Sequence, residues 1–363
     1  MEPQRIPGIS RVTSVRQKDL TARARAAADV AKMTAAAVDA EARFPKESFA
    51  EIRKQRLLGI QVPQALGGEG ASIAELADIC YILGQACSST ALIYAMHQIK
   101  MACIVRHTKG NAALERILGR IAAEQLLMAS STTEGQGGGN VRSSEAAIEH
   151  DGANVTLERT ATVISYAVDA DGVVTTARRA KDAAGSDQVL LVLLKADYTL
   201  ERLQVWDTLG MRGTNSEGFT LRARAAAEQV MPEPYDRIHA QTMVPFAHLL
   251  WGSVWAGIAA AAAGRAQAFI RQAVRSSNGQ LPPGAPHFTQ AMSTLRTLRG
   301  VLASNLRSYE AGMSDEKSIA SLESSSRRHV HPINPAHRRP CDCRSVLSYG
   351  IAALICCLRW RPR

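Results

Sequence analysis

The sequence predicts an α+β protein built from an N-terminal all-α domain, a middle antiparallel β domain and an incomplete C-terminal helical bundle. Three observations predict this order. Helical periodicity from about Gln17 to Glu124 predicts a helical domain at residues 1–125. Short β-branched segments bounded by Gly, Asp or Asn predict the β domain at residues 126–232, and long helical patterns after Tyr235 predict the bundle at residues 233–322. Because helices and strands do not alternate along the chain, a βαβ fold is not expected.

The N-terminal helices are predicted from the spacing of apolar residues. The segment FPKESFAEIRKQRLLG brings Phe49, Ile52 and Leu57 to one face and stops at Gly59. Residues 72–108 are typical of two helices broken near residues 88–89, and residues 111–125 of another. Three cysteines lie in this apolar helical sequence and are expected to be buried thiols: Cys80, Cys87 and Cys103.

The middle domain opens with SSTTEGQGGGNV, which holds four glycines in the five positions from Gly135. Bare backbone of this kind lets amide N–H groups approach an anion. The segment is not a Walker loop, because no Lys-Ser/Thr follows the glycines. It is not a dinucleotide fingerprint either, because Asn140 stands where the last glycine belongs. Six strand-like segments between residues 126 and 226 make up the domain.

Two long helices are predicted after Tyr235, interrupted by SSNGQLPPGAPH. Residues 243–264 form a stretch of 22 residues in which only His248 is ionisable, and that length suits a bilayer span. The second half is mostly alanine and an amphipathic segment follows, so we expect a central bundle helix and no membrane span. Trp251 and Trp255, four residues apart, are expected to pack in the core.

The net charge of +10 is concentrated at the C-terminus. Eight arginines and one aspartate from Arg327 to Arg363 account for +7 of it, so the rest of the chain carries no nucleic-acid signature. Residues 323–363 have no sustained period and are expected to be an unrelated end, as after a frameshift, or a disordered tail. Their His and Cys spacing fits no zinc module, so no metal is expected. The N-terminus lacks an apolar signal segment, which predicts a cytoplasmic location.

Three stretches together resemble the acyl-CoA dehydrogenase family of flavoproteins. TTEGQGGGN, at residues 132–140, is similar to the family's Thr-Glu-Pro-Gly-Ala-Gly-Ser-Asp signature. WDTLGMRGTNSEGF, at residues 206–219, contains an element similar to the family's Leu-Gly-x-Arg-x-Ser/Thr, and QVPQALGGEG, at residues 61–70, resembles a turn of its N-terminal domain. The resemblance covers about residues 43–311 and implies the same helix–sheet–helix order.

The resemblance implies FAD as the cofactor, held by the glycine-rich loop. Thr132 and Thr133 would contact the flavin, with Thr133 bonded to the pyrimidine ring. Gly138 and Gly139 would let backbone amides reach the diphosphate, although the family has Ser and Asp where this chain has Gly139 and Asn140. Glu134 is expected to cap local backbone and not to catalyse.

Two further flavin contacts are implied outside the loop. Ser165 would lie at the flavin N5 edge, in a VIS segment where Val163 takes the place of the family's tryptophan. Arg275, in RSSNG, would reach the FAD diphosphate of a neighbouring subunit, as a forked guanidinium can. This second contact implies a homo-oligomer.

The implied reaction is α,β-desaturation of an acyl thioester, carried by CoA or by a carrier protein, with an electron-transfer flavoprotein as acceptor. A carboxylate would remove the α-proton while the β-hydrogen leaves as hydride to flavin N5. In the family that carboxylate lies late in the bundle, beyond the departure after about Leu322, or at the position of Ala247. No catalytic residue is therefore assigned, and weak or absent turnover is expected. A flavin-dependent monooxygenase of the same fold and a non-catalytic truncated product are the alternatives.

Overall fold

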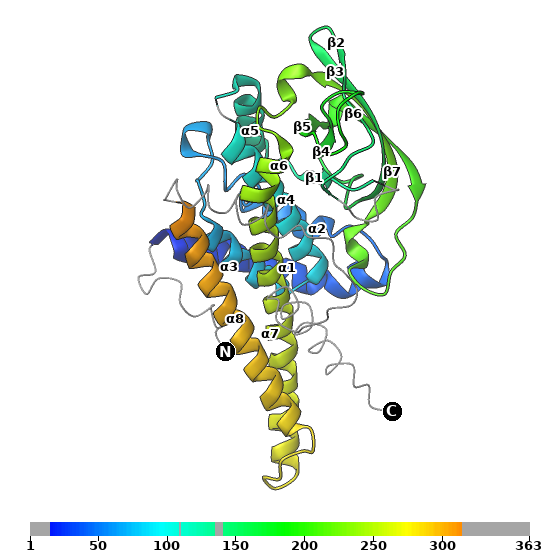
Figure 1. Ribbon diagram of the computed structural model, residues 1–363. Coiled ribbons are helices and arrows are strands. Elements are labelled where there is room, and N and C mark those ends of the chain that lie inside the picture. The colour runs from blue at the N-terminus through cyan, green and yellow to red at the C-terminus, as the bar shows by residue number, and fades with distance from the viewer. Residues whose placement is uncertain (1–14, 109, 135–140, 314–363) are drawn as a thin grey trace, which may run out of the picture.

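The computed structural model describes residues 15–108, 110–134 and 141–313, and it has the predicted order of helices, sheets and helices (Figure 1). The N-terminal helices are α1 (Val15–Ala40), α2 (Lys46–Lys54), α3 (Ile73–Gly84), α4 (Ser88–His107) and α5 (Ala112–Glu124). The strands are β1 (Met128–Ser131), β2 (Glu149–Asp151), β3 (Asn154–Ile164), β4 (Gly172–Arg178), β5 (Gln188–Leu194), β6 (Tyr198–Gln204) and β7 (Glu217–Ala226). The C-terminal helices are α6 (Tyr235–Ile238), the π-helix His239–Met243, α7 (Val244–Ser276) and α8 (Ala285–Met313). The predicted fold class is confirmed. Residues 323–363, with the predicted tail, lie outside the described residues.

Local sequence signals set the helix ends. Ser72 and Glu75 form a capping box at the start of α3, and the Asn111 side chain accepts hydrogen bonds from two backbone amides at the start of α5. The helix α4 is buried along most of its length, because the β domain lies against it on one side and α7 against another. Polar residues in such a helix need partners inside the protein.

His97 of α4 shows how this need is met. Its Nδ1 atom accepts a hydrogen bond from the Met128 amide at 3.0 Å, and its Nε2 atom lies 2.9 Å from the Leu58 carbonyl oxygen. Both bonds can form at once only in the neutral tautomer that carries the proton on Nε2. His97 thus ties α4 to the first strand of the β domain.

The β domain consists of two sheets. One has the strand order β1–β4–β5 and the other β2–β3–β7–β6. The pairing is antiparallel as predicted, except that β1 and β4 run parallel, because a long connection through the second sheet separates them in sequence. The β3–β7 ladder is regular from Asn154 to Ala161 and then shifts register before Ile164.

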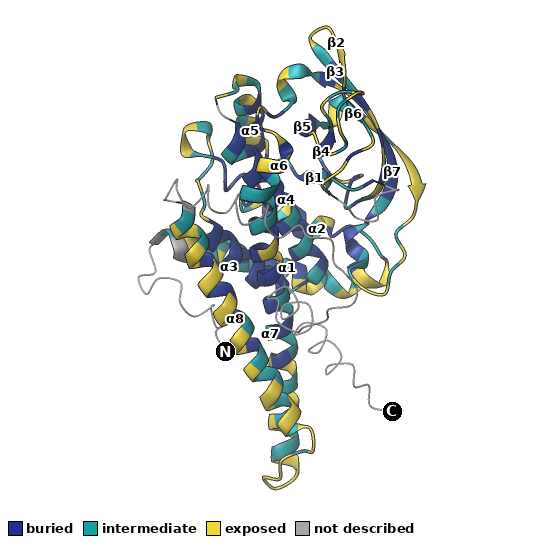
Figure 2. Cartoon of the chain, viewed as in Figure 1, coloured by how far each residue is buried: buried dark blue, intermediate teal, exposed yellow. Residues whose placement is uncertain are grey.

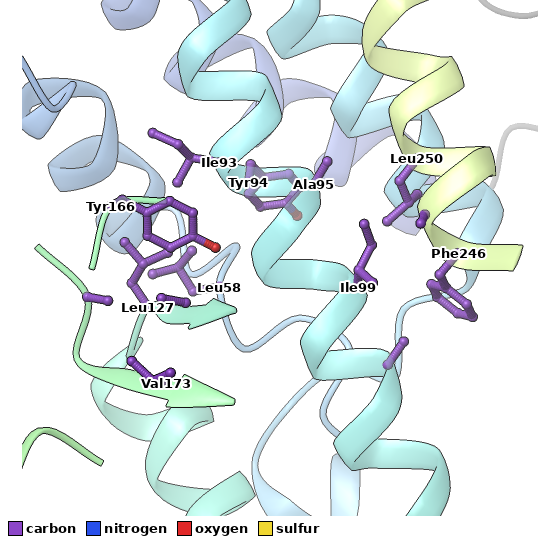
Figure 3. Close-up of a cluster of buried hydrophobic side chains, with 14 of the residues drawn as sticks. Leu58, Ile93, Tyr94, Ala95, Ile99, Leu127, Tyr166, Val173, Phe246 and Leu250 are labelled. Carbon is purple, nitrogen blue, oxygen red and sulfur yellow. The ribbon is translucent and has the colours of Figure 1, made fainter. Parts of the chain in front are cut away.

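The core joins the β domain to both groups of helices. Figure 3 shows Leu127, Tyr166 and Val173 of the β domain beside Ile93 and Tyr94 of α4. Farther along α4, the side chain of Ile99 faces Phe246 and Leu250 of α7, and all of these residues belong to one buried cluster. α4 therefore lies between the strands and α7, so the environment of its polar residues is set by all three parts of the chain.

α7 and α8 pack together and extend well beyond the rest of the molecule (Figure 1). Their far ends are mostly exposed in Figure 2, and Phe269 there is 62% exposed. Among the described residues, Tyr235–Ser276 is the one helical stretch long and apolar enough to cross a membrane, and 61% of its most apolar window is buried. Its inner half packs against α3 and α4, which fits the predicted central helix of a bundle.

The burial of His97 predicts a pH dependence of stability. Burial lowers the pKa of His97 to about 4, below its ordinary value of 6.5. Below pH 6.5 the unfolded chain binds the proton and the folded chain does not, so the free energy of unfolding falls by about 1.4 kcal/mol per pH unit until pH 4. Between pH 6.5 and pH 5 we expect the free energy of unfolding of His97→Gln to fall by about 2 kcal/mol less than that of the wild type. Urea unfolding at the two pH values measures this difference. His150→Gln, on the exposed strand β2, is the control and should leave the profile unchanged.

Candidate functional site

A pocket of about 500 Å³ lies between the β domain and the helices α4 and α7. Five serine and threonine side chains line it from the β domain: Ser130, Thr132, Thr133, Thr162 and Ser165. From the helical side it is lined mainly by Met96, Ile99, Lys100, Met243, Ala247 and Trp251. The pocket therefore has one wall of hydrogen-bonding groups and one apolar wall with a single amine, an arrangement suited to a flat ligand with a polar edge.

A β-bulge orients the β-domain wall. Side chains of β3 alternate between core and solvent until Ala161, and then the register shifts, so that Thr162 and Val163, although consecutive, both line the pocket. Bulges re-aim side chains in this way and are frequent next to active sites. The following Ser165 hydroxyl lies 2.8 Å from the Ser216 hydroxyl, which holds it at the pocket wall.

Tyr166, two residues after the end of β3, has a strained backbone conformation. Its φ of 45° is left-handed, which for a bulky residue costs about 1–2 kcal/mol. Two hydrogen bonds stabilise this conformation. The Tyr166 hydroxyl donates to the Met128 carbonyl at 3.0 Å, and the Tyr166 amide donates to the Thr214 carbonyl at 2.8 Å. Strained backbone of this kind is common at functional sites, and Tyr166 lines the pocket.

Glu134 and Arg159 anchor the loop that carries Thr132 and Thr133. The Glu134 carboxylate accepts hydrogen bonds from the amides of Glu145 and Ala146, so it caps backbone as predicted, although these amides are 11 and 12 positions away and not local. It also lies 3.0 Å from the Arg159 guanidinium, and both side chains are buried. Burial lowers the pKa of Arg159. Glu134, which directly follows Thr133, is thus bonded both to β3 and to the backbone of residues 145–146.

The helical wall is held by the π-helix His239–Met243. Its Thr242 hydroxyl contacts Arg106 Nε at 3.0 Å and His107 Nε2 at 2.8 Å, which ties the segment to the end of α4. The next residue, Met243, then lies with its sulfur 3.3 Å from Lys100 Nζ. Single π-helical turns are often found at functional sites, because the wider turn displaces one side chain from the regular helix face.

The structure brings together three of the six residues predicted for the cofactor. Thr132, Thr133 and Ser165 all line the pocket. Gly138 and Gly139 lie outside the described residues, and Arg275 is exposed near the far end of α7 and does not line the pocket. Its predicted role toward a neighbouring subunit remains a prediction.

Ala247 and the neighbouring His248 lie early in α7, where the family resemblance implied a possible catalytic carboxylate. Ala247 lines the pocket, whereas the His248 ring is exposed and contacts the Val244 carbonyl of its own helix at 2.8 Å. The prediction that Trp251 packs in the core is wrong: Trp255 packs against the core, but Trp251, one turn before it, lines the pocket and is 38% exposed. In the described part of the chain, no group of three or more His, Cys, Asp or Glu residues is placed to hold a metal ion.

Comparison with known proteins bears on the identity of this fold. The family model "Acyl-CoA dehydrogenase, N-terminal domain" matches residues 15–125. A probable acyl-CoA dehydrogenase of Bacillus subtilis (strain 168), YngJ, is 24% identical over 199 residues, which cover 54% of this chain and 52% of that protein. The chain thus spans about half the length of this curated relative in the match.

Solved structures extend the likeness to nearly the whole chain. Butyryl-CoA dehydrogenase from Megasphaera elsdenii superposes with a TM-score of 0.73 at 14% identity, covering 96% of this chain and 95% of that one. The chain has the acyl-CoA dehydrogenase fold. KijD3, in complex with FMN and a dTDP-amino-keto sugar, has a TM-score of 0.78 at 20% identity, covering 98% and 86%. The methanesulfinate monooxygenase MsuC from Pseudomonas fluorescens has a TM-score of 0.76 at 16% identity, covering 93% and 85%.

The family resemblance predicted from the three motifs is therefore confirmed. Proteins of the acyl-CoA dehydrogenase fold include both dehydrogenases and monooxygenases, so the fold alone does not choose the reaction. Sequence reasoning missed four residues of the site or its support. They are Lys100, Arg159, Met243 and Trp251.

Proposed function

We propose that the chain is a flavin-dependent oxidoreductase of the acyl-CoA dehydrogenase type, with FAD held at the pocket between the β domain and α4–α7. The observation that carries this proposal is the meeting of Thr132, Thr133 and Ser165 at one wall of that pocket. They come from β-domain segments about 30 residues apart in sequence, and the hydroxyl wall matches the polar edge of an isoalloxazine ring. When bound, FAD would supply two-electron redox chemistry.

The chain's own residues would orient the flavin and exclude water. Thr133 and Ser165 would hold the polar edge of the ring, and the Glu134–Arg159 ion pair would keep the threonines in place. The apolar side chains of Ile99, Met243 and Trp251 would enclose the rest of the site, of which Trp251 provides an aromatic surface. Gly138, Gly139 and the Arg275 of a neighbouring subunit would complete the diphosphate site in a homo-oligomer.

The substrate proposed is an acyl thioester, with an electron-transfer flavoprotein as electron acceptor. Of the described residues that line the pocket, Glu134 alone carries a carboxylate, and it is already bonded to Arg159 and to two amides. We therefore propose that desaturation by this chain is weak, because the described lining offers no free carboxylate to accept the α-proton.

A flavin-dependent monooxygenase is the second candidate. A pocket whose described lining has no available carboxylate fits an oxygenation that needs no α-proton abstraction. Two assays distinguish the candidates. A monooxygenase would form product only with oxygen and an added flavin reductase. A dehydrogenase would form product without oxygen when an artificial electron acceptor is supplied.

A flavin titration tests the proposed cofactor. We expect the purified protein to bind FAD, seen as a shifted and resolved flavin absorbance band. Thr133→Val should weaken FAD binding by about tenfold, the effect of losing one hydrogen bond of about 1–1.5 kcal/mol. Thr199→Val on the exposed face of β6 is the matched control and should bind FAD as the wild type does. An FAD spectrum that stays unchanged when the protein is added at tens of micromolar would rule the proposal out.

A further inference from the structure

Lys100 is a buried amine at the wall of the pocket. It lies on α4, is 3% exposed and lines the cavity together with the apolar side chains of Met96 and Ile99. An ammonium group has three hydrogens to donate. The hydrogen bond that Lys100 makes to the described residues goes to the Met243 sulfur at 3.3 Å, and a thioether is a weak acceptor.

This acceptor is also shared. The Tyr235 hydroxyl donates to the same Met243 sulfur, again at 3.3 Å. The π-helix that precedes α7 fixes Met243 in this position, through the contacts of Thr242 with the end of α4. The Met243 sulfur therefore lies beside Lys100 because of how the π-helix packs on α4.

No anion in the described lining compensates the charge of Lys100. Glu134 is the one residue of the described lining with a carboxylate, and that carboxylate is already paired with Arg159 at 3.0 Å. Burial lowers the pKa of Lys100, and the nearby Arg159 lowers it further, while Cys103 acts in the opposite direction. A buried cation without a good partner is destabilising, and an anion bound beside it would offset that cost.

We propose that Lys100 Nζ and the apolar wall bind the carboxylate end of a small organic ligand. One further step rests on the proposed function. If the substrate is an acyl thioester, its acyl group would be a short chain with a second carboxylate at the far end, and Lys100 would bind that carboxylate. Met96, Ile99 and Ala247 would contact the methylene groups of that chain. A ligand with an amine in the same position would be excluded, because two like charges would meet in an apolar site.

The carboxylate preference can be measured without turnover. Three probes of equal chain length, hexanoate, hexanamide and hexylamine, are titrated into the purified full-length protein by calorimetry, with and without FAD. We expect hexanoate to bind at least tenfold more tightly than hexanamide, and hexylamine not to bind. Equal binding of hexanoate and hexanamide to the wild-type protein overturns the proposal, whatever the variants do.

Variants assign the preference to Lys100. In Lys100→Met, which keeps an unbranched side chain but removes the amine, the preference for hexanoate should disappear while hexanamide binds as before. Lys32→Met, at an exposed lysine of α1, is the matched control and should keep the preference. Met243→Leu leaves the amine in place, so it should keep or strengthen hexanoate binding. A Lys100→Met protein that still prefers hexanoate contradicts the proposal.

A thioester pair separates this inference from the proposed function. Glutaryl-CoA ends in a carboxylate, and 5-methylhexanoyl-CoA has an isopropyl group of similar shape in its place. With FAD bound, we expect glutaryl-CoA to bind at least tenfold more tightly. If the protein binds no flavin but prefers hexanoate, the proposed function fails and the Lys100 site stands. If flavin binds and neither carboxylate is preferred, the Lys100 site fails alone.

Discussion

Replacing Arg159 with methionine is expected to lower the free energy of unfolding by about 3–5 kcal/mol, because the change leaves the Glu134 carboxylate buried without its cationic partner. Arg159 Nη1 lies 3.0 Å from that carboxylate and also contacts the Ser144 and Thr176 hydroxyls, at 3.3 Å and 3.1 Å. Urea unfolding followed by circular dichroism measures the effect. We expect FAD binding to weaken as well, since Glu134 directly follows Thr133.

Two further variants separate the ion pair from general packing. Arg159→Met combined with Glu134→Leu removes both charges, so the double variant should recover part of the loss, as buried pairs replaced by apolar groups often do. Arg222→Met, at an exposed arginine that pairs with Glu158 and Glu201, should change stability by less than about 1 kcal/mol. A double variant no more stable than Arg159→Met would show that lost packing, and not the unpaired carboxylate, dominates.

The sequence predicted the fold because each element follows its own local period. β3 is an example: Val155, Leu157 and Ala161 occupy alternate positions and are all buried. Arg159 occupies the same register, so an arginine among the inward positions of an alternating strand was a signal for a buried ion pair. Its partner could not have been identified, because Glu134 is 25 positions away and no period links them.

The helical wall of the site was less predictable. Lys100 was missed: it lies in a helix with apolar residues on all its faces, and that pattern does not show which cavity a polar side chain reaches. The π-helix at His239–Met243 depends on contacts of Thr242 with Arg106 and His107, more than 130 residues earlier. The bulge that turns Thr162 and Val163 to the pocket similarly depends on the pairing of β3 with β7. Such features come from tertiary contacts and leave no local pattern.

A glycine substitution in α7 is expected to affect both stability and the pocket. Gly257 packs against α3 so closely that an added Cβ would lie 2.3 Å from the Tyr81 carbonyl oxygen and 3.2 Å from the backbone of Gly84. Gly84 of α3 packs against α7 equally closely, because a Cβ added at Gly84 would lie 2.6 Å from the Val254 carbonyl oxygen. Gly257→Ala must therefore move one helix backbone, and we expect it to cost about 1–3 kcal/mol in urea unfolding.

The same helix provides the control. Gly264 has no atom within 4 Å of an added Cβ, so Gly264→Ala should stabilise the helix by up to about 1 kcal/mol through its higher helix propensity. Because α7 also carries Ala247 and Trp251 into the pocket, Gly257→Ala should weaken FAD and hexanoate binding, whereas Gly264→Ala should leave both unchanged. If Gly257→Ala lowered stability but left both ligands bound as in the wild type, α7 would be able to shift without displacing the pocket wall. The close packing of α3 on α7 would then support the fold and not the site.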